Sequence, residues 1–383
     1  INISKKRSFF LFGARSTGKT TLLQELFSER EAEFFDLLDP RILEKLEAYP
    51  SELEPLIQPA IKQKKIIVID EIQRVPALLD IVHRTIQKDK AIFALTGSSA
   101  RKLKRGSANL LAGRASIYNL FPLLFTEMEE SFDLDSALAW GTLPELTSIE
   151  DDDEKVRFLQ SYTVSYLQEE IVAEQIVRKL PPFRRFLQIA SQMNSKVINY
   201  SKIASDINTD PSNVRNYFEI IEDTLLGFKL DSYHASIRKR QRHNPKFYWF
   251  DTGIVRSLQK FLGSGLNRGT SYYGELFESF LVNQIRAGLE YQIKQFSLSY
   301  LLTKDGAEID LIVERVGEKT LCIEIKSSSS VRSEQLTNLK KLSADIENSI
   351  PLCLYTGDKR LLYDNVEVLP WQTGLTEFSL VPQ

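Results

Sequence analysis

The chain has 383 residues, of which 26% are charged, and its formal net charge is −2. This length exceeds one ordinary hydrophobic core, so two to four domains are expected, and the near-neutral charge excludes a uniformly basic surface for nucleic acid. No apolar stretch approaches the roughly 20 residues of a membrane-spanning helix, and the two cysteines, Cys322 and Cys353, lie in apolar runs. We therefore expect a cytoplasmic protein with reduced, buried thiols and no membrane partner.

The first 124 residues alternate strands and helices. The run 66–69 is apolar and β-branched, which is typical of a strand buried on both faces of a parallel sheet. The predicted strands are 8–12, 33–38, 66–69, 91–95 and 116–121, and the predicted helices are 19–28, 41–48, 78–87 and 103–112. This order predicts a doubly wound α/β domain over residues 1–124.

Three further domains are predicted. Residues 125–180 form a helical lid, in which the acidic run 150–154 is interpreted as a solvated loop. Residues 181–260 have the element order of a winged helix, with helices 183–193, 201–206 and 211–226 and strands 230–233 and 246–250. Residues 261–383 form a second α/β module, with helices 273–287 and 333–344 and strands 292–298, 307–314, 320–326 and 352–355.

The first strand runs into a phosphate-binding loop. Its residues, together with the threonine that follows, are Gly13, Ala14, Arg15, Ser16, Thr17, Gly18, Lys19, Thr20 and Thr21. The two glycines permit the required backbone angles, and successive N–H groups at a helix N-terminus attract phosphate. Lys19 is expected to reach the β- and γ-phosphates, and the Thr20 hydroxyl to bind Mg²⁺. The pattern therefore predicts ATP and Mg²⁺ as ligands.

Two carboxylates and a serine follow neighbouring strands of the same sheet. Asp70 ends the run 66–69 and is expected to hold hydrated Mg²⁺, and Glu71 is expected to polarise the attacking water. Ser98 ends the next strand and is the candidate for contact with the γ-phosphate or the water. The alternative for Ser98 is an ordinary polar loop.

The C-terminal module carries a nuclease-like set of residues. Glu324 and Lys326 lie two residues apart on one strand and therefore share a face, and Asp310 lies on the preceding strand. Glu278 comes from the helix before them. Three carboxylates and a lysine suit one or two Mg²⁺ ions and a hydroxide nucleophile, as in the PD-(D/E)xK pattern. The alternative is a degenerate nuclease fold retained for binding.

Basic and polar residues mark a candidate DNA surface on the winged helix. They lie at the start of its second and third helices and between its two strands: Lys202, Ser212, Asn213, Arg215, Arg238, Lys239, Arg240 and Arg242. The alternative is a packing module with a solvated basic loop. The Asp251–Gly253 stretch is interpreted as a turn and a helix cap.

Several motifs together resemble one known family. They are Asp70-Glu-Ile-Gln-Arg-Val-Pro-Ala-Leu78, Leu95-Thr-Gly-Ser-Ser-Ala-Arg-Lys-Leu103, Leu111-Ala-Gly-Arg-Ala115, Ser161-Tyr-Thr-Val-Ser-Tyr-Leu, Lys246-Phe-Tyr-Trp-Phe-Asp-Thr-Gly and Gly274-Glu-Leu-Phe-Glu. The family is the bacterial and archaeal ATPases that pair an AAA-type module with a C-terminal domain similar to the PD-(D/E)xK nuclease fold. The resemblance covers essentially the whole chain. One departure is Gln168-Glu169-Glu170, where the family usually has an arginine before the acidic residue.

The resemblance implies an AAA-type oligomer that acts on DNA, such as a hexameric ring. It also implies that Arg114 is an arginine finger for the ATP site of a neighbouring subunit. Arg101 is the rival candidate, and a solvated surface arginine is the alternative for either.

Taken together, these features predict ATP hydrolysis coupled to DNA binding or remodelling, with metal-dependent DNA cleavage as a second activity. The alternative function is an ATP-dependent oligomeric switch, or a DNA- or partner-binding protein, whose nuclease-like domain is inactive.

Overall fold

The computed structural model describes residues 1–28, 30–99, 111, 113–166, 180–234 and 244–382. The chain divides into two compact units. Unit 1 holds residues 1–121 and 223–226, and unit 2 holds residues 122–222 and 227–383.

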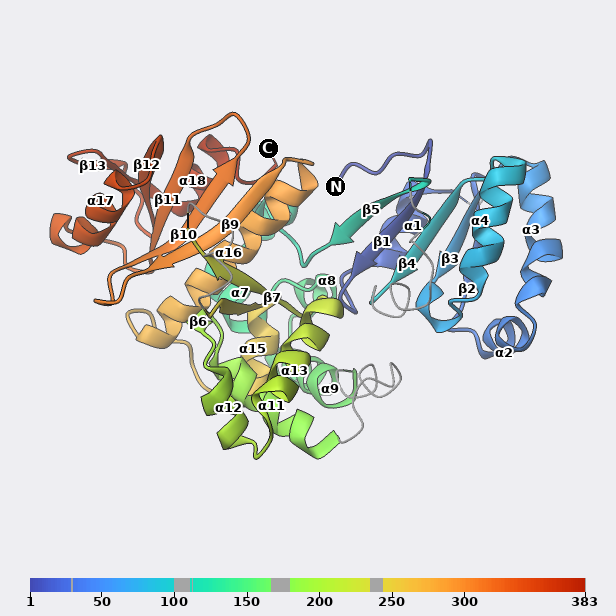
Figure 1. Ribbon diagram of the computed structural model, residues 1–383, viewed down its shortest axis with the longest axis horizontal. Helices are drawn as coiled ribbons and strands as arrows, with labels where there is room; N and C mark the ends of the chain where they lie inside the picture. Colours follow the sequence, from blue (N-terminus) through green and yellow to red (C-terminus); the bar gives the residue numbers. More distant parts are fainter. Residues whose placement is uncertain (29, 100–110, 112, 167–179, 235–243, 383) are drawn as a thin grey trace. The chain divides into compact units, whose positions relative to one another are not determined.

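Unit 1 is built on a five-stranded sheet with the order β2-β3-β4-β1-β5, in which all the pairings are parallel (Figure 1). The strands are β1 Ser8–Gly13, β2 Ala32–Asp36, β3 Ile66–Asp70, β4 Phe93–Gly97 and β5 Ala115–Leu120. The helices are α1 Lys19–Leu26, α2 Pro40–Ala48, α3 Leu53–Lys62 and α4 Leu78–Asp89, with short 3₁₀ turns at Pro50–Glu52 and Ile72–Arg74. The predicted parallel α/β architecture is confirmed for this unit.

Apolar side chains that alternate along the strands of unit 1 pack in two separate cores. Phe10 and Phe12 of β1 pack in one apolar cluster with side chains of α3 and α4, whereas Phe9 and Leu11 pack in another with Leu23 of α1. Successive strand residues point to opposite faces, so a strand buried on both faces must be apolar throughout. Figure 1 shows α3 and α4 along the same side of the sheet.

Helix α3 was not predicted from the sequence. It contains Pro59, which removes one backbone donor, yet Leu53, Ile57 and Ala60 are buried on one face. Tertiary burial of this face therefore outweighs the local cost of the proline. The predicted helix 103–112 lies almost entirely outside the described residues.

Unit 2 contains a nine-stranded mixed sheet with the order β13-β14-β12-β11-β10-β9-β7-β8-β6. Its strands are β6 Lys196–Val197, β7 Gly227–Ser232, β8 Lys246–Trp249, β9 Phe296–Leu302, β10 Glu308–Arg315, β11 Thr320–Lys326, β12 Ser349–Tyr355, β13 Leu361–Tyr363 and β14 Val366–Pro370. Strand β7 pairs in parallel with β9, with Asp231 beside Ser299. The strands of the predicted winged helix and those of the C-terminal module therefore belong to one sheet.

The helices of unit 2 include a long central one, α16 Ser271–Tyr291. The others are α6 Phe125–Met128, α7 Leu134–Trp140, α8 Pro144–Ser148, α9 Asp152–Ser161, α11 Leu180–Gln192, α12 Tyr200–Asp206, α13 Pro211–Asp223, α15 Thr252–Gln259, α17 Thr337–Ala344 and α18 Trp371–Glu377. A π-helical turn spans Tyr162–Tyr166, and 3₁₀ turns span Glu129–Ser131 and Ser333–Leu336. Both cysteines are buried, as predicted.

Two predictions for unit 2 are wrong. The acidic run 150–154 is not a loop: Asp151 caps α9, and three acidic residues fill its first turn, where the helix dipole favours negative charge. The strand predicted at 292–298 begins four residues later, because α16 continues to Tyr291. At Gly288 a Cβ atom would collide with the backbone of Leu380, so close packing of the C-terminal segment against α16 requires glycine there.

Asp251 joins the end of β8 to two helices and is a helix cap, as predicted. Its Oδ1 accepts a hydrogen bond from the backbone N–H of Ile254 in α15 at 3.1 Å, and its Oδ2 accepts one from the N–H of Thr142 at 2.8 Å. At Gly141 or Gly253 a Cβ atom would overlap Asp251 or the carbonyl of Trp140, respectively. This cluster of small residues therefore lets backbone N–H groups surround a buried carboxylate.

The stability of unit 2 should fall with rising pH because of Asp251. Burial raises the pKa of Asp251 to about 6, although N–H groups of Thr142, Ile254 and Gly253 lower it, and the ordinary value is 3.8. The folded state therefore binds the proton more tightly, and this contribution to stability, about 3 kcal/mol, is present below pH 4 and lost as the pH rises through 6. Asp251→Asn should remove that loss. Urea unfolding at several pH values measures it by tryptophan fluorescence, since Trp140, Trp249 and Trp371 all lie in unit 2.

Asp133→Asn is the matched control because it changes an exposed cap on α7 and leaves Asp251 in place. It should keep the wild-type dependence on pH. Parallel stability curves for the wild type and Asp251→Asn between pH 4 and 7 would contradict this account.

Candidate functional site

The phosphate-binding loop connects β1 to α1. At Gly13 a Cβ atom would lie 2.7 Å from the carbonyl oxygen of Leu120 and from Thr17 Oγ1, and Gly18 has φ +86°, so both positions favour glycine. Lys19 is buried, and its Nζ donates to the carbonyl oxygens of Gly13 at 2.9 Å and Ala14 at 3.1 Å. The ammonium group thus lies over the loop, where it would attract a polyphosphate.

The other residues of the loop region differ in their contacts, backbone angles and exposure. Thr17 Oγ1 donates to the carbonyl of Ala14 at 2.8 Å, and Ser16 has φ +62°. Arg15 is half-buried, and Thr21 is exposed on the first turn of α1. Loop N–H groups followed by a helix N-terminus are an arrangement that can bind an anion.

Three strand ends bring hydroxyl and carboxylate groups together beside the loop. Thr20 Oγ1 donates to Asp70 Oδ2 at 2.6 Å, and Thr96 Oγ1 donates to Asp70 Oδ1. Thr20 lies on α1, which follows β1, whereas Asp70 and Thr96 lie on β3 and β4. The three residues meet because β3, β4 and β1 are parallel and adjacent in the sheet. Hard oxygen donors of this kind suit Mg²⁺, so the group fits the cation that accompanies ATP.

Glu71 has three hydrogen-bond partners at the same edge, namely Thr96, Gln73 and Ser98. Its backbone φ is +57°, and its N–H donates to Thr96 Oγ1 at 3.1 Å. Gln73 Nε2 donates to Glu71 Oε2 and to Ser98 Oγ, the latter at 3.0 Å. Gln73 thus links the two residues that the sequence indicated for water and γ-phosphate.

Gln73 and the role of Thr96 were missed from the sequence. Gln73 is only 5% exposed, and its Oε1 has no hydrogen-bond partner. Its only signal is its position two residues after Glu71, which does not show that a 3₁₀ turn brings its amide back to the carboxylate.

Arg114 lies at the opposite edge of the sheet from the loop. It precedes β5, which runs parallel to β1 with Ala115 beside Ser8 and Leu120 beside Gly13. Five residues of extended strand span roughly 17 Å, so this separation keeps Arg114 away from the loop of its own chain. Arg101 lies outside the described residues.

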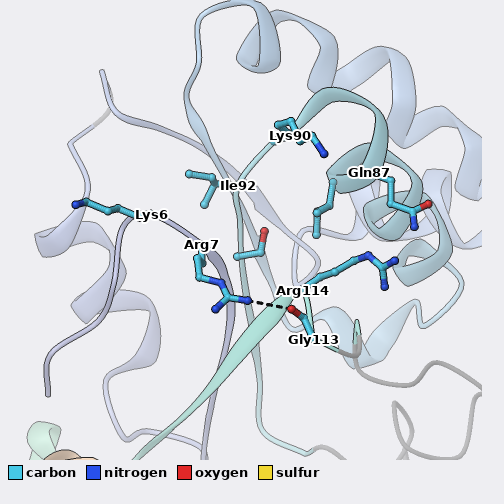
Figure 2. Close-up of a pocket in the computed structure, with 10 residues that line it drawn as sticks. Lys6, Arg7, Gln87, Lys90, Ile92, Gly113 and Arg114 are labelled. Atoms are coloured by element: carbon cyan, nitrogen blue, oxygen red, sulfur yellow. Dashed lines mark hydrogen bonds between the residues drawn. The ribbon is translucent and has the colours of Figure 1, made fainter.

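A basic depression of about 650 Å³ surrounds Arg114 (Figure 2). Lys6, Arg7 and Lys90 also line it, and Arg7 donates to the carbonyl of Gly113 at 2.9 Å. The ten residues that line the depression include no acidic residue.

The candidate DNA residues are exposed where the structure describes them. Lys202, Ser212, Asn213 and Arg215 lie in the first two turns of α12 and α13. The guanidinium of Arg215 lies 4.1 Å from the ring centroid of Tyr200, a cation–π contact that fixes its direction. Arg238, Lys239, Arg240 and Arg242 lie outside the described residues, as do Gln168, Glu169 and Glu170.

The nuclease-like residues lie on β10 and β11 as predicted. Lys326 Nζ donates to Glu324 Oε1 at 2.6 Å, and Asp310 Oδ2 accepts a hydrogen bond from the N–H of Ile325 at 2.8 Å. The antiparallel pairing of the two strands explains this proximity.

Three more residues join this group that the sequence did not indicate. Lys246 of β8 contacts Glu278 Oε1 at 3.2 Å and also contacts Glu308. Tyr248 donates to Glu278 Oε1 at 2.7 Å. Lys246 was assigned to a winged-helix strand, and only the shared sheet places β8 beside the C-terminal residues.

Burial controls the charges of this acidic centre, defined as Glu278, Glu308, Asp310 and Glu324. It raises the pKa of Glu278, Asp310 and Glu324, against the lowering effect of Lys246 or Lys326. Burial alone would lower the pKa of Lys246, but the surrounding carboxylates outweigh it and the pKa is raised. The carboxylates around Lys246 therefore favour its charged ammonium form.

The metal ligands predicted for the C-terminal module, Glu278, Asp310 and Glu324, have other partners in the structure. Within the described part of the chain, no group of three histidine, cysteine, aspartate or glutamate side chains is placed to hold a metal ion. The residues of the acidic centre are instead paired with lysines, a tyrosine hydroxyl and a backbone N–H group. We therefore derive no metal-dependent step there.

Comparison with known proteins assigns three regions. Residues 5–129 match the AAA domain family, residues 131–265 match a domain of unknown function (DUF8612), and residues 273–373 match a second one (DUF4143). Most of the region that matches the AAA domain family lies in unit 1. Among the described residues, no helix is long and apolar enough to cross a membrane.

Similar proteins cover nearly the whole chain. An uncharacterized protein of Mycobacterium tuberculosis is 26% identical over 373 residues, which is 97% of this chain and 81% of that protein. An uncharacterized protein of Methanocaldococcus jannaschii is 23% identical over 428 residues, which is 97% of this chain and 85% of that protein.

A solved structure from Pyrococcus horikoshii also matches. It is a Signal Transduction ATPase with Numerous Domains (STAND) protein with a tetratricopeptide repeat sensor, 14% identical, with a TM-score of 0.22. The match covers 75% of this chain and 44% of that one, so the chain spans less than half its length.

Proposed function

We propose that the AAA domain binds Mg·ATP and hydrolyses it. The observation that carries this proposal is the 2.6 Å contact between Thr20 and Asp70, beside a loop whose lysine faces the phosphate position. In the proposed complex Lys19 binds the β- and γ-phosphates, and Mg²⁺, bound with the substrate, offsets their charge. Thr20 and Asp70 are the residues that would hold that ion.

The proposed reaction is an attack of water on the γ-phosphorus. The new P–O bond forms as the bond to the β–γ bridging oxygen breaks, and ADP and inorganic phosphate leave. Glu71 accepts a hydrogen bond from the water and orients it, while Gln73 and Ser98 fix the Glu71 carboxylate.

We also propose that Arg114 acts on the ATP site of a second copy of the chain. Its position at the far edge of the sheet supports action between subunits, because its own loop is a strand length away. The permanent charge of an arginine would stabilise the transition state in the neighbour. This arrangement makes the protein a homo-oligomer when active, which a hexameric ring would satisfy.

Lys19→Ala should abolish nucleotide binding and turnover, because it removes the buried ammonium group that lies over the loop. Fluorescent ATP titration and phosphate release measure the two effects, with exposed Lys62→Ala of α3 as the matched control. A Lys19→Ala protein that binds and turns over ATP as well as the parent would contradict the site.

Mixing Lys19→Ala chains with inactive Arg114→Ala chains should restore part of the turnover, since some interfaces then hold one intact site.

Glu71→Gln should lower kcat by about 10²- to 10⁴-fold while nucleotide affinity is kept. Gln73→Leu should lower kcat less and leave KM nearly unchanged, because it removes a donor that positions Glu71. If both act through one carboxylate, the double variant should be no slower than Glu71→Gln. Steady-state kinetics decide this, and additive losses in the double variant would separate Gln73 from Glu71.

We propose DNA as the partner of the α12–α13 surface. The support is the exposed cluster at the helix starts, in which Arg215 is held against Tyr200. If DNA on this surface stimulates ATP turnover, the protein acts as a motor. If turnover does not change with DNA, the protein acts as a nucleotide switch. Cleavage of DNA is not part of the proposal, because the acidic centre lacks a group of metal ligands.

Arg215→Ala should weaken DNA binding several-fold and reduce DNA-stimulated turnover without changing turnover in the absence of DNA. Each phosphate contact removed should also flatten the dependence of affinity on salt. Fluorescence anisotropy and ATPase assays with single-stranded, duplex and junction DNA provide the measurements. The control is Arg185→Ala, which changes an exposed arginine of α11. An equal effect of both variants would contradict a specific DNA contact by Arg215 and indicate nonspecific attraction of DNA to positive charge.

A further inference from the structure

We propose that Lys246 is the resident cation of the acidic centre, and that its ammonium group takes the place of a divalent metal ion there. The inference concerns unit 2 alone and does not depend on the proposed ATP hydrolysis.

The first support is the position of the ammonium group. The Lys246 side chain is 5% exposed, and its Nζ contacts carboxylates from two different elements, Glu278 of α16 and Glu308 of β10. A buried ammonium needs several oxygen partners to offset its lost hydration. Carboxylates from separate elements supply them here, as they would for a metal ion.

The second support is that the surroundings hold this arrangement fixed. Tyr248 donates its hydroxyl hydrogen to the same Glu278 oxygen that Lys246 contacts. The Lys246 ammonium also lies 5.6 Å from the ring centroid of Tyr300, whose hydroxyl donates to the carbonyl of Asn244 at 2.6 Å. Two aromatic side chains thus confine both the lysine and the glutamate.

The third support is the second lysine of the centre. Lys326 pairs with Glu324 at 2.6 Å, and electrostatic attraction connects Asp310 with both Lys246 and Lys326. The carboxylates of the centre therefore face two positive charges that belong to the chain itself.

These contacts are poorly compatible with a divalent ion. Mg²⁺ requires a near-octahedral set of oxygen ligands at about 2.0–2.1 Å. A lysine ammonium among the same carboxylates repels such an ion and occupies their oxygens. The absence of a three-ligand group among the described residues agrees with this reading. The centre thus acts as an ion-pair network that joins α16, β8, β10 and β11.

Direct measurement of Mn²⁺ binding tests the proposal. Electron paramagnetic resonance measures the concentration of free Mn²⁺ in a solution of the 383-residue chain without nucleotide. The protein carries Asp70→Asn, which removes the ATP-site carboxylate. We expect no Mn²⁺ uptake at the centre in this parent protein and uptake of one ion per chain after Lys246→Met. Mn²⁺ should also raise the unfolding temperature of Lys246→Met, but not that of the parent.

Further variants assign any bound ion. Asp310→Asn added to Lys246→Met should abolish the uptake, and Lys246→Arg, which keeps the charge, should take up none. Lys229→Met removes another ion-paired lysine of the same sheet, whose partner Glu222 lies 2.7 Å away, and should also take up none.

Uptake of one Mn²⁺ by the parent protein that disappears with Asp310→Asn would overturn the proposal. This comparison needs no Lys246 variant, so it decides the question even if Lys246→Met fails to fold. A folded Lys246→Met that takes up no Mn²⁺ would equally overturn it, since removal of the resident cation would then open no site.

Discussion

The hydrogen bond between the Thr20 hydroxyl and the Asp70 carboxylate is the contact on which the candidate ATP site depends. It joins residues 50 positions apart, and it exists because β1, β4 and β3 run parallel and end at one edge of the sheet. Strand β4 lies between β1 and β3, and its Thr96 contacts the other oxygen of the same carboxylate. A change in the direction or order of these strands would separate the groups that we assign to phosphate, magnesium and water.

The same parallel arrangement separates Arg114 from the loop. Residues that follow strand ends meet the nucleotide position, whereas residues that precede strands lie a strand length away. One subunit therefore presents a loop at one edge and a basic depression at the other. In the proposed assembly, Arg114 at one edge of a subunit would act on the loop at the other edge of its neighbour.

Unit 2 handles buried charge in two ways. Asp251 is surrounded by backbone N–H groups, which become available because Gly141 and Gly253 let the chain approach closely. The acidic centre instead uses lysines from β8 and β11. Backbone N–H groups lower the pKa of Asp251 without outweighing its burial, whereas in the acidic centre two lysines of the chain offset the repulsion among four carboxylates.

The sequence alone determined the features that depend on neighbouring residues. Glycine spacing identified the loop from Gly13 to Thr20, and apolar runs identified a parallel sheet whose strand ends carry Asp70, Glu71 and Ser98. The strand positions of Asp310, Glu324 and Lys326 also followed from local alternation. These features could be predicted because backbone angles and side-chain direction repeat over a few residues.

Only the tertiary structure decided which distant side chains meet. Gln73 reaches Glu71 through a turn whose shape depends on buried packing, and Lys246 reaches Glu308 because β7 pairs with β9 and so brings β8 and β10 into one sheet. Helix α3 forms despite Pro59 because its apolar face is buried. Strand pairing and burial join residues far apart in the chain, so no local pattern of residues carries that information.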